Sequence, residues 1–262
     1  MMGHSHAVTG AAGWLALTCP PPFGFGLLDL STEHVLSGIL IAGGAALLPD
    51  TDHHSGTASY VLPPISGMLT RFIGTISGGH RHGTHSFIGA AAFTAIAVLA
   101  SLWRTDLRYY APWLPDGFST FQIGNWLLIC YLVVMGAKAL RIAPGWQGAW
   151  IIALGLGTFL TYAAPTSMWW LPLAVGIGCL IHMLGDALTT QGIPPLWPLV
   201  PLPPVETAFW RRNGYMAIPA LGNAGSIREH ILICLVSAYC AASILETLSP
   251  GSLSSALTTI GG

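Results

Sequence analysis

The sequence predicts an all-α membrane protein, a polytopic bundle of about seven apolar helices that forms a single integral membrane domain over residues 1–262. Hydrophobic residues make up 53% of the chain and charged residues only 7%, which is too little charge for a soluble surface. The apolar residues also fall in blocks of about 20, the length a helix needs to cross about 30 Å of hydrocarbon.

Proline and glycine divide these blocks and set the order of the expected helices. The apolar segments run over 5–19, 33–49, 84–103, 122–140, 147–164, 168–190 and 229–248. Prolines at 20–22 lack an amide donor and stop a helix, and Ala143-Pro144-Gly145 makes another short break. Short breaks predict antiparallel neighbours, while about 50–83 and 191–228 are left as long loops.

Composition also excludes some classes of protein. The net charge of −1 and the absence of any Lys or Arg run give no reason to expect nucleic acid as a partner. The five cysteines are single residues without CxxC spacing, so we expect them in the core. No Lys or Arg precedes the first apolar segment, so we expect it to be retained and not cleaved as a signal.

Counting spans assigns the polar residues to faces of the membrane. If all seven segments cross, nine of the ten histidines lie on one face and His34 lies on the other. The same face carries most of the positive charge, against Arg104 and Arg108 opposite. These residues are Arg71, Arg81, Lys138, Arg141, Arg211, Arg212 and Arg228. The positive-inside tendency therefore predicts that the histidine-rich face is cytoplasmic.

Asp50 and Asp52 follow the second segment directly, after the helix-ending Leu48-Pro49, and His53 comes next. An Asp-x-Asp pair alone is ordinarily a solvated loop or a helix cap. Imidazole beside carboxylate, however, suits zinc, manganese or iron. We therefore read this segment as a candidate metal site.

His182 and Asp186 stand four residues apart in an apolar helix, so both lie on one face about one turn apart. Such a pair is costly near a membrane unless it is partnered. The alternatives are a hydrogen bond that only locks two helices, two metal ligands, or one ligand oriented by the Asp.

Three histidines, His80, His82 and His85, precede the third segment, whose start Thr84 or Ser86 can cap. A helix N-terminus attracts anions, and Arg81 adds a cation that suits a phosphoester. Glu229 opens the last segment, where an acid favoured by the helix dipole is the stronger reading.

Together these motifs resemble a bacterial family of inner-membrane, metal-dependent hydrolases whose best-known member is controlled by the LexA repressor. The matching blocks are His6-Ala-Val-Thr-Gly10, Leu48 to His53, Gly79-His80-Arg81, Thr84-His85-Ser86, His182 to Thr189, Gly192 to Pro198, and Gly225-Ser226 with Glu229. The resemblance implies a metal set of His6, Asp50, Asp52, His53, His80, His85, His182 and Asp186, with Glu229 a candidate. His4, His54 and His82 look like additions in this sequence. At the position of His82 a glycine is commoner in the family.

That family is in turn distantly similar to the all-helical zinc-dependent phospholipase C and P1 nuclease group. The analogy implies a hydrolase that cleaves a phosphoester of a membrane lipid or other amphiphilic substrate. We expect two or three divalent ions, zinc first with manganese or iron as alternatives. Asp52 or Asp186 would take a proton from water, and Arg81 would hold phosphoryl oxygens.

Two rival functions stay open at this point. A divalent-metal transporter predicts acids and histidines near the middle of several spans. A non-catalytic membrane protein with a structural metal predicts closed coordination. The oligomeric state, the substrate and the identity of the metal are not written in the sequence.

Overall fold

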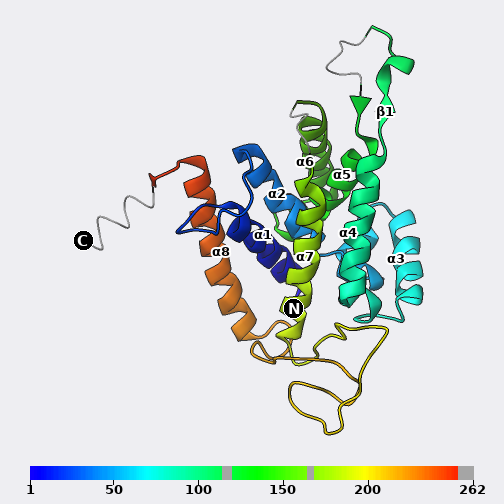
Figure 1. The fold of residues 1–262 in the computed structure, drawn as a ribbon, viewed down its shortest axis with the longest axis vertical. Coiled ribbons are helices and arrows are strands. Elements are labelled where there is room, and N and C mark those ends of the chain that lie inside the picture. The colour runs from blue at the N-terminus through cyan, green and yellow to red at the C-terminus, as the bar shows by residue number, and fades with distance from the viewer. Residues whose placement is uncertain (114–119, 164–167, 253–262) are drawn as a thin grey trace.

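The computed structural model describes residues 1–113, 120–163 and 168–252, and within these ranges the chain is mostly helical (Figure 1). The helices are α1 Gly3–Thr18, α2 Thr32–Ala45, α3 Ile65–Ile76, α4 Phe87–Leu102, α5 Ile123–Ala139, α6 Trp146–Thr158, α7 Trp170–Ala187 and α8 Ile227–Leu248. A π-helical turn, η6 Phe159–Ala163, extends α6. A two-stranded antiparallel pair, β1 Thr105–Asp106 and β2 Thr120–Phe121, lies beyond α4 and α5.

Each of the seven predicted segments overlaps one of these helices, and residue 164 of the fifth segment lies outside the described residues. Among the described residues, three stretches are long and apolar enough to cross a membrane: Thr32–Asp52, Trp170–Ala187 and Ile227–Leu248. Ile65–Ile76, Phe87–Leu102 and Ile123–Ala139 are apolar but shorter. The membrane character of the chain is therefore supported, and a count of seven spans stays a prediction.

The helix α3 is missing from the predicted set, because its 12 residues lie in the segment read as a loop between 50 and 83. In α3 two polar side chains face the protein and most apolar side chains face outward, the reverse of a helix on the surface of a soluble protein. Ser66 and Thr70 are buried, whereas Ile65, Met68 and Phe72 are each more than 60% exposed. Such a helix is suited to an apolar surrounding on its outer face.

Small residues bring the central helices close together. A Cβ at Gly44 of α2 would collide with the backbone of Leu132 in α5, and one at Gly178 of α7 would lie 2.7 Å from the Cβ of Ala45. Close backbone approach at small residues is the usual packing of membrane helices. The result is that the end of α2, where Asp50 and Asp52 follow, is fixed against α7.

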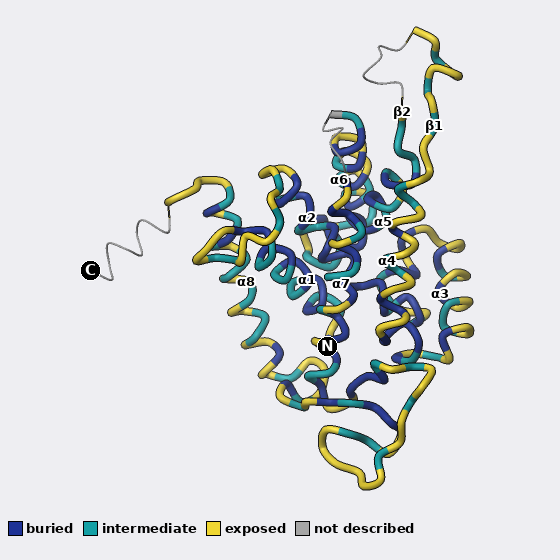
Figure 2. Tube along the Cα trace, in the orientation of Figure 1, coloured by how far each residue is buried: buried dark blue, intermediate teal, exposed yellow. Residues whose placement is uncertain are grey.

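The last helix, α8, packs loosely on the outside of the bundle (Figure 2). Its buried residues are Glu229, Ser243 and Glu246, while Ile227, Leu235 and other apolar side chains are exposed. An apolar outer face on a helix of 22 residues fits contact with lipid.

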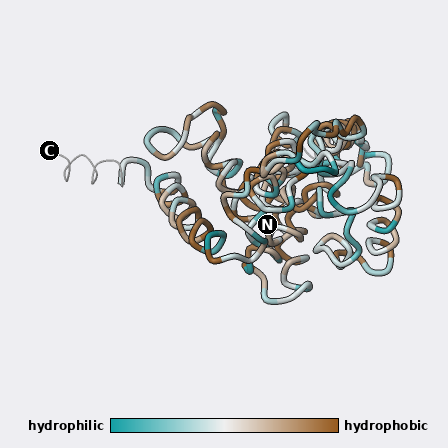
Figure 3. The backbone as a smooth tube through the Cα atoms, turned by 90° about the horizontal axis from the view of Figure 1, so that it is seen from below, coloured by the Kyte–Doolittle hydropathy of each residue, from teal (hydrophilic) through white to brown (hydrophobic). Residues whose placement is uncertain are grey.

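The helix ends that carry the predicted polar residues meet at one end of the bundle. The starts of α1, α4 and α8 and the end of α7 meet there, and a long segment, residues 189–226, crosses beneath them (Figures 1 and 3). We call residues 189–226 the strap. Isolated bridges hold it together, Ile193 with Met216 and Trp210 with Met216, and a third joins Thr189 to Gly222.

Candidate metal centre

Four donor atoms lie close together at this end of the bundle, and they come from three segments: the turn after α2, the turn before α4, and α7. They are Asp50 Oδ1, His85 Nε2, His182 Nε2 and Asp186 Oδ2, and we call these four residues the central group. His85 Nε2 lies 3.0 Å from His182 Nε2, 3.6 Å from Asp50 Oδ1 and 3.5 Å from Asp186 Oδ2. His182 Nε2 lies 3.8 Å from Asp50 Oδ1 and 3.6 Å from Asp186 Oδ2.

The separations among Asp50 Oδ1, His85 Nε2 and His182 Nε2 suit three ligands of one tetrahedral cation. Ligands about 2.0–2.1 Å from a zinc ion stand roughly 3.3 Å apart, because a tetrahedron's edge is about 1.63 times its centre-to-corner distance. The three separations run from 3.0 to 3.8 Å and bracket that value. Neutral imidazole and carboxylate are also the donors that zinc, manganese and iron accept.

The hydrogen bonds of the two histidines fix the tautomers. His182 Nδ1 lies 2.7 Å from the carbonyl oxygen of Ala46, which only accepts, so Nδ1 carries the proton. His85 Nδ1 lies 3.3 Å from Asp52 Oδ2 and 3.1 Å from Thr84 Oγ1, whose own hydrogen goes to Asp52, so His85 Nδ1 also donates. Both Nε2 atoms therefore aim lone pairs into the central group.

His6 adds a donor on the far side of His182. The two rings stack with their centroids 3.7 Å apart, and His6 Nε2 lies 3.2 Å from Asp186 Oδ1. Both ring nitrogens of His6 and Asp186 Oδ2 are buried and make no hydrogen bond. Buried polar atoms are nearly always satisfied, so these orphaned atoms fit a cation held by His6, His182 and Asp186.

A third set of donors reaches the surface. Asp50, Asp52 and His80 offer donor atoms within 4.8 Å of one another. The side chains of Asp50 and His80 are 24% and 38% exposed, whereas those of His85 and His182 are fully buried. The cluster is therefore open to solvent on the side of Asp50 and His80.

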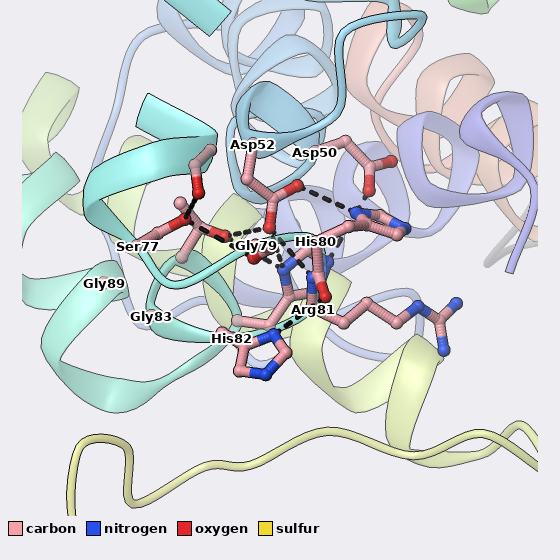
Figure 4. A network of polar contacts seen from close by, with 12 residues as sticks. Asp50, Asp52, Ser77, Gly79, His80, Arg81, His82, Gly83 and Gly89 are labelled. Carbon is pink, nitrogen blue, oxygen red and sulfur yellow. Dashed lines mark hydrogen bonds and ion pairs between the residues drawn. The ribbon is translucent and has the colours of Figure 1, made fainter. Parts of the chain in front are cut away.

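Asp52 lies at the centre of a network that orders this cluster (Figure 4). Its Oδ1 lies 2.9 Å from His80 Nδ1. Its Oδ2 accepts from the Arg81 amide at 2.9 Å and from the Thr84 hydroxyl at 2.6 Å, and lies near His85 Nδ1 as well. A carboxylate bonded in this way orients two imidazoles, which is the arrangement found behind metal-ligating histidines.

Arg81 ties the loop before α4 to α7. Its guanidinium donates to Asp186 Oδ1 at 2.8 Å and reaches Thr189 Oγ1 and the Gly192 carbonyl at 3.4 and 3.5 Å. Its φ of 61° lies in the left-handed region, which a side chain with a Cβ rarely adopts. The strained backbone places both the Arg81 amide on Asp52 and its guanidinium on Asp186.

Three contributors to the site were not foreseen from the sequence. The Tyr215 hydroxyl of the strap donates to the Arg81 carbonyl at 2.9 Å and lies 3.2 Å from His82 Nδ1. Thr189 donates to the Asp186 carbonyl at 2.7 Å. The amino group of Met1 forms an ion pair with Asp186 Oδ1. A lone tyrosine in a long loop carries no spacing signal that would have revealed the first of these.

Comparison with known proteins places the chain. The family model described as YdjM inner membrane protein matches residues 1–249, nearly the whole chain. The chain belongs to the YdjM inner membrane protein family. Neither the curated proteins nor the solved structures contain a match. Membership supports the predicted inner-membrane location; LexA control, hydrolysis and likeness to phospholipase C or P1 nuclease stay predictions.

The structure brings most of the predicted donors of this YdjM-family chain together. His6, Asp50, Asp52, His80, His85, His182 and Asp186 each belong to at least one of three groups of donor atoms, found among the described residues. His182 and Asp50 are candidates for sharing between ions, since each belongs to two of the groups.

His53 and Glu229 lie outside those groups. His53 Nδ1 is 2.9 Å from Ser55 Oγ, and its ring packs against His80 at 4.7 Å. Partial burial, with the nearby His80 and His54 rings, lowers the pKa of His53, which keeps it neutral at pH 7. Glu229 accepts from the Met2 and Gly225 amides at 2.8 and 2.9 Å. These bonds favour a role for Glu229 in holding the start of α8.

Proposed function

We propose that this protein is a membrane-bound, metal-dependent hydrolase that cleaves a phosphoester of a lipid or other amphiphilic substrate. The observation that carries the proposal is the central group, in which two imidazoles and two carboxylates from three segments come together. His85 Nε2 and His182 Nε2 lie 3.0 Å apart, and each lies within 3.8 Å of Asp50 Oδ1 and of Asp186 Oδ2. Each imidazole is held from behind by a hydrogen-bond acceptor, as metal-ligating histidines are.

Two or three divalent ions are proposed, because one tetrahedral ion uses four donors and the cluster offers more. His85, His182, Asp50 and Asp186 would hold one, with His6 and His80 serving the neighbouring positions. Zinc is the first candidate, with manganese or iron as alternatives. A bound ion supplies Lewis acidity for the phosphoryl group and lowers the pKa of water toward neutrality.

The proposal assigns different roles to the carboxylates of Asp50, Asp52 and Asp186. Asp52 has its oxygens engaged by His80, Arg81 and Thr84, so it suits the positioning of imidazoles. Asp186 is buried beside the Arg81 guanidinium. Asp50 alone of the three reaches solvent, with 24% of its side chain exposed, and is the best placed to exchange a proton with water.

Arg81 is also better suited to positioning than the sequence suggests. Its guanidinium donates hydrogen bonds to Asp186 and to two oxygens of the strap, at 2.8 to 3.5 Å. We propose that it fixes Asp186 and adds positive potential to the site. Any direct contact with a phosphoryl oxygen would need the guanidinium to share its hydrogen bonds.

The location of the cluster supports an enzyme over a transporter. The donors lie at or near helix ends, and the cluster is open to solvent at Asp50, after α2, and at His80, before α4. A purely structural metal site would be closed, whereas this one has an accessible side. Access from the end of a membrane bundle suits a substrate whose head group lies at the membrane surface.

Turnover of defined substrates tests the proposal. Purified full-length protein in lipid nanodiscs, loaded with zinc or manganese, should hydrolyse at least one of phosphatidate, a polyprenyl phosphate and a phosphodiester lipid, and His182→Ala should not. Divalent-ion flux in proteoliposomes without any hydrolysis would favour the transporter. Bound metal with neither flux nor hydrolysis would favour the structural site.

Orientation and regulation complete the proposal. We infer that the clustered end faces the cytoplasm and that expression is controlled by a LexA-type repressor. A reporter fused after Gly262 should then prove non-cytoplasmic, given an odd number of spans. Transcript levels should rise after DNA damage.

A further inference from the structure

An apolar cavity of about 510 Å³ lies between the strap and the helices beside the metal centre. Its volume is in the range of small-ligand sites, about 300–1,000 Å³. The wall toward the helices includes Phe87, Leu180 and Met183, and the wall toward the strap includes Ile193, Trp210 and Ala217. No charged side chain lines it among the described residues.

Several residues that line the cavity are next in sequence to residues of the metal centre or to residues that contact Arg81. Met183 and Ala187 of its wall each follow a ligand candidate, His182 and Asp186, on α7. Ile193 follows Gly192, whose carbonyl meets Arg81. A molecule in the cavity therefore rests against the segments that carry the metal donors.

A cation without a carboxylate partner stands at the strap side. Arg211 follows the wall residue Trp210, and no described carboxylate forms an ion pair with it. Its guanidinium donates to the Thr190 carbonyl at 3.0 Å, while its Nε is buried without a hydrogen bond. Thr190 is next to Thr189, which Arg81 approaches at 3.4 Å. Arg211 and Arg81 thus contact adjacent residues of the strap.

We propose that this cavity holds a hydrocarbon chain of an anionic glycerophospholipid whose phosphate lies at Arg211. The occupant follows from three observations: an apolar cavity in a membrane protein, a guanidinium that lacks a counterion, and continuity with the central group. The inference rests on the proposed function in one respect, that the bound lipid is the substrate.

Photo-crosslinking tests the lipid site without turnover. Full-length protein in nanodiscs is illuminated with phosphatidic acid carrying a diazirine in one acyl chain, and labelled peptides are mapped by mass spectrometry. Leu180→Trp fills the cavity from a side chain that is 46% exposed, so the fold should tolerate it. Leu235→Trp is the matched control, on α8 and 66% exposed.

Labelling should concentrate on the strap and on α7, and Leu180→Trp should reduce it by about tenfold while Leu235→Trp does not. Arg211→Gln should weaken labelling by phosphatidic acid more than labelling by a phosphatidylcholine probe. Equal labelling in both tryptophan variants, or equal labelling by the two probes in wild-type protein, would overturn the proposal. If the cavity is labelled but the protein hydrolyses none of the substrates, the proposed hydrolase function fails and the lipid site stands. If the protein hydrolyses a lipid but the cavity is not labelled, the lipid site fails and the hydrolase function stands.

Discussion

His85 Nε2 and His182 Nε2 lie 3.0 Å apart in a buried space, and each belongs to a ring whose other nitrogen already donates a hydrogen bond. Two lone pairs at this distance repel unless a proton or a metal ion lies between them. The nearby carboxylates of Asp50 and Asp186 make a cation there favourable. Metal binding and the stability of this end of the bundle should therefore be linked.

Removal of metal should destabilise the protein. A ligand that binds only the folded state at 100 times its Kd adds about 2.7 kcal/mol to the free energy of unfolding. EDTA or a stronger chelator should therefore lower the Tm of the wild-type protein by several degrees, measured by intrinsic fluorescence in detergent. The same chelator should leave the Tm of His182→Ala unchanged, and an equal drop in both would mean that the effect does not come from this site.

Asp52→Asn should weaken metal binding without removing a proposed central ligand. The amide keeps the shape of Asp52 but cannot accept from all of the donors that now surround it. Loss of a group that orients ligating histidines typically costs about 10–100-fold in metal affinity. Titration with a fluorescent zinc competitor measures this, with the exposed Asp29→Asn as control.

Arg81→Gly separates the Arg81 side chain from its backbone. Glycine accepts the φ of 61° without strain, so the change removes the guanidinium from Asp186 and relaxes the loop. We expect metal affinity to fall about tenfold or more as Asp186 loses its partner. Arg141→Gly is the control, because Arg141 is exposed and has a φ of 58°. A wild-type affinity in Arg81→Gly would contradict the positioning role.

Tyr215→Phe should loosen the strap. The variant keeps the ring and loses the hydroxyl that donates to the Arg81 carbonyl at 2.9 Å. A buried hydrogen bond of this kind contributes about 0.5–1.5 kcal/mol. Hydrogen exchange should become faster around residues 80–85 and in the strap, whereas Tyr60→Phe, at an exposed position, should leave both unchanged.

Much of this arrangement is predictable from the sequence because two strong signals act together. Hydropathy locates the helices, and counting spans puts His6, Asp50, His85 and His182 at one end, where the structure has them. The short α3 escapes the hydropathy signal, since its apolar and polar residues are mixed over only 12 positions. The spacing of residues in the sequence also does not distinguish a metal ligand from a residue that orients a ligand by a hydrogen bond.

Asp52 and Glu229 show this limit most clearly. Asp52 differs from Asp50 only in its hydrogen-bond partners, which come from residues 80–85, distant in sequence. Glu229 looks like a ligand candidate in the motif but bonds to the amides of Met2 and Gly225. The Tyr215 contact depends on how the strap folds back, and no local pattern encodes it.

The metal content of the purified protein tests most directly whether the residues of the central group form a metal centre. Full-length protein, expressed with zinc, manganese and iron available and purified without chelator, is analysed by inductively coupled plasma mass spectrometry beside His182→Ala and the exposed His54→Ala. We expect at least one divalent ion per chain in wild type and in His54→Ala, and a loss of metal in His182→Ala. A wild-type protein that folds, keeps Asp50 and His85 intact and holds no stoichiometric metal would contradict it.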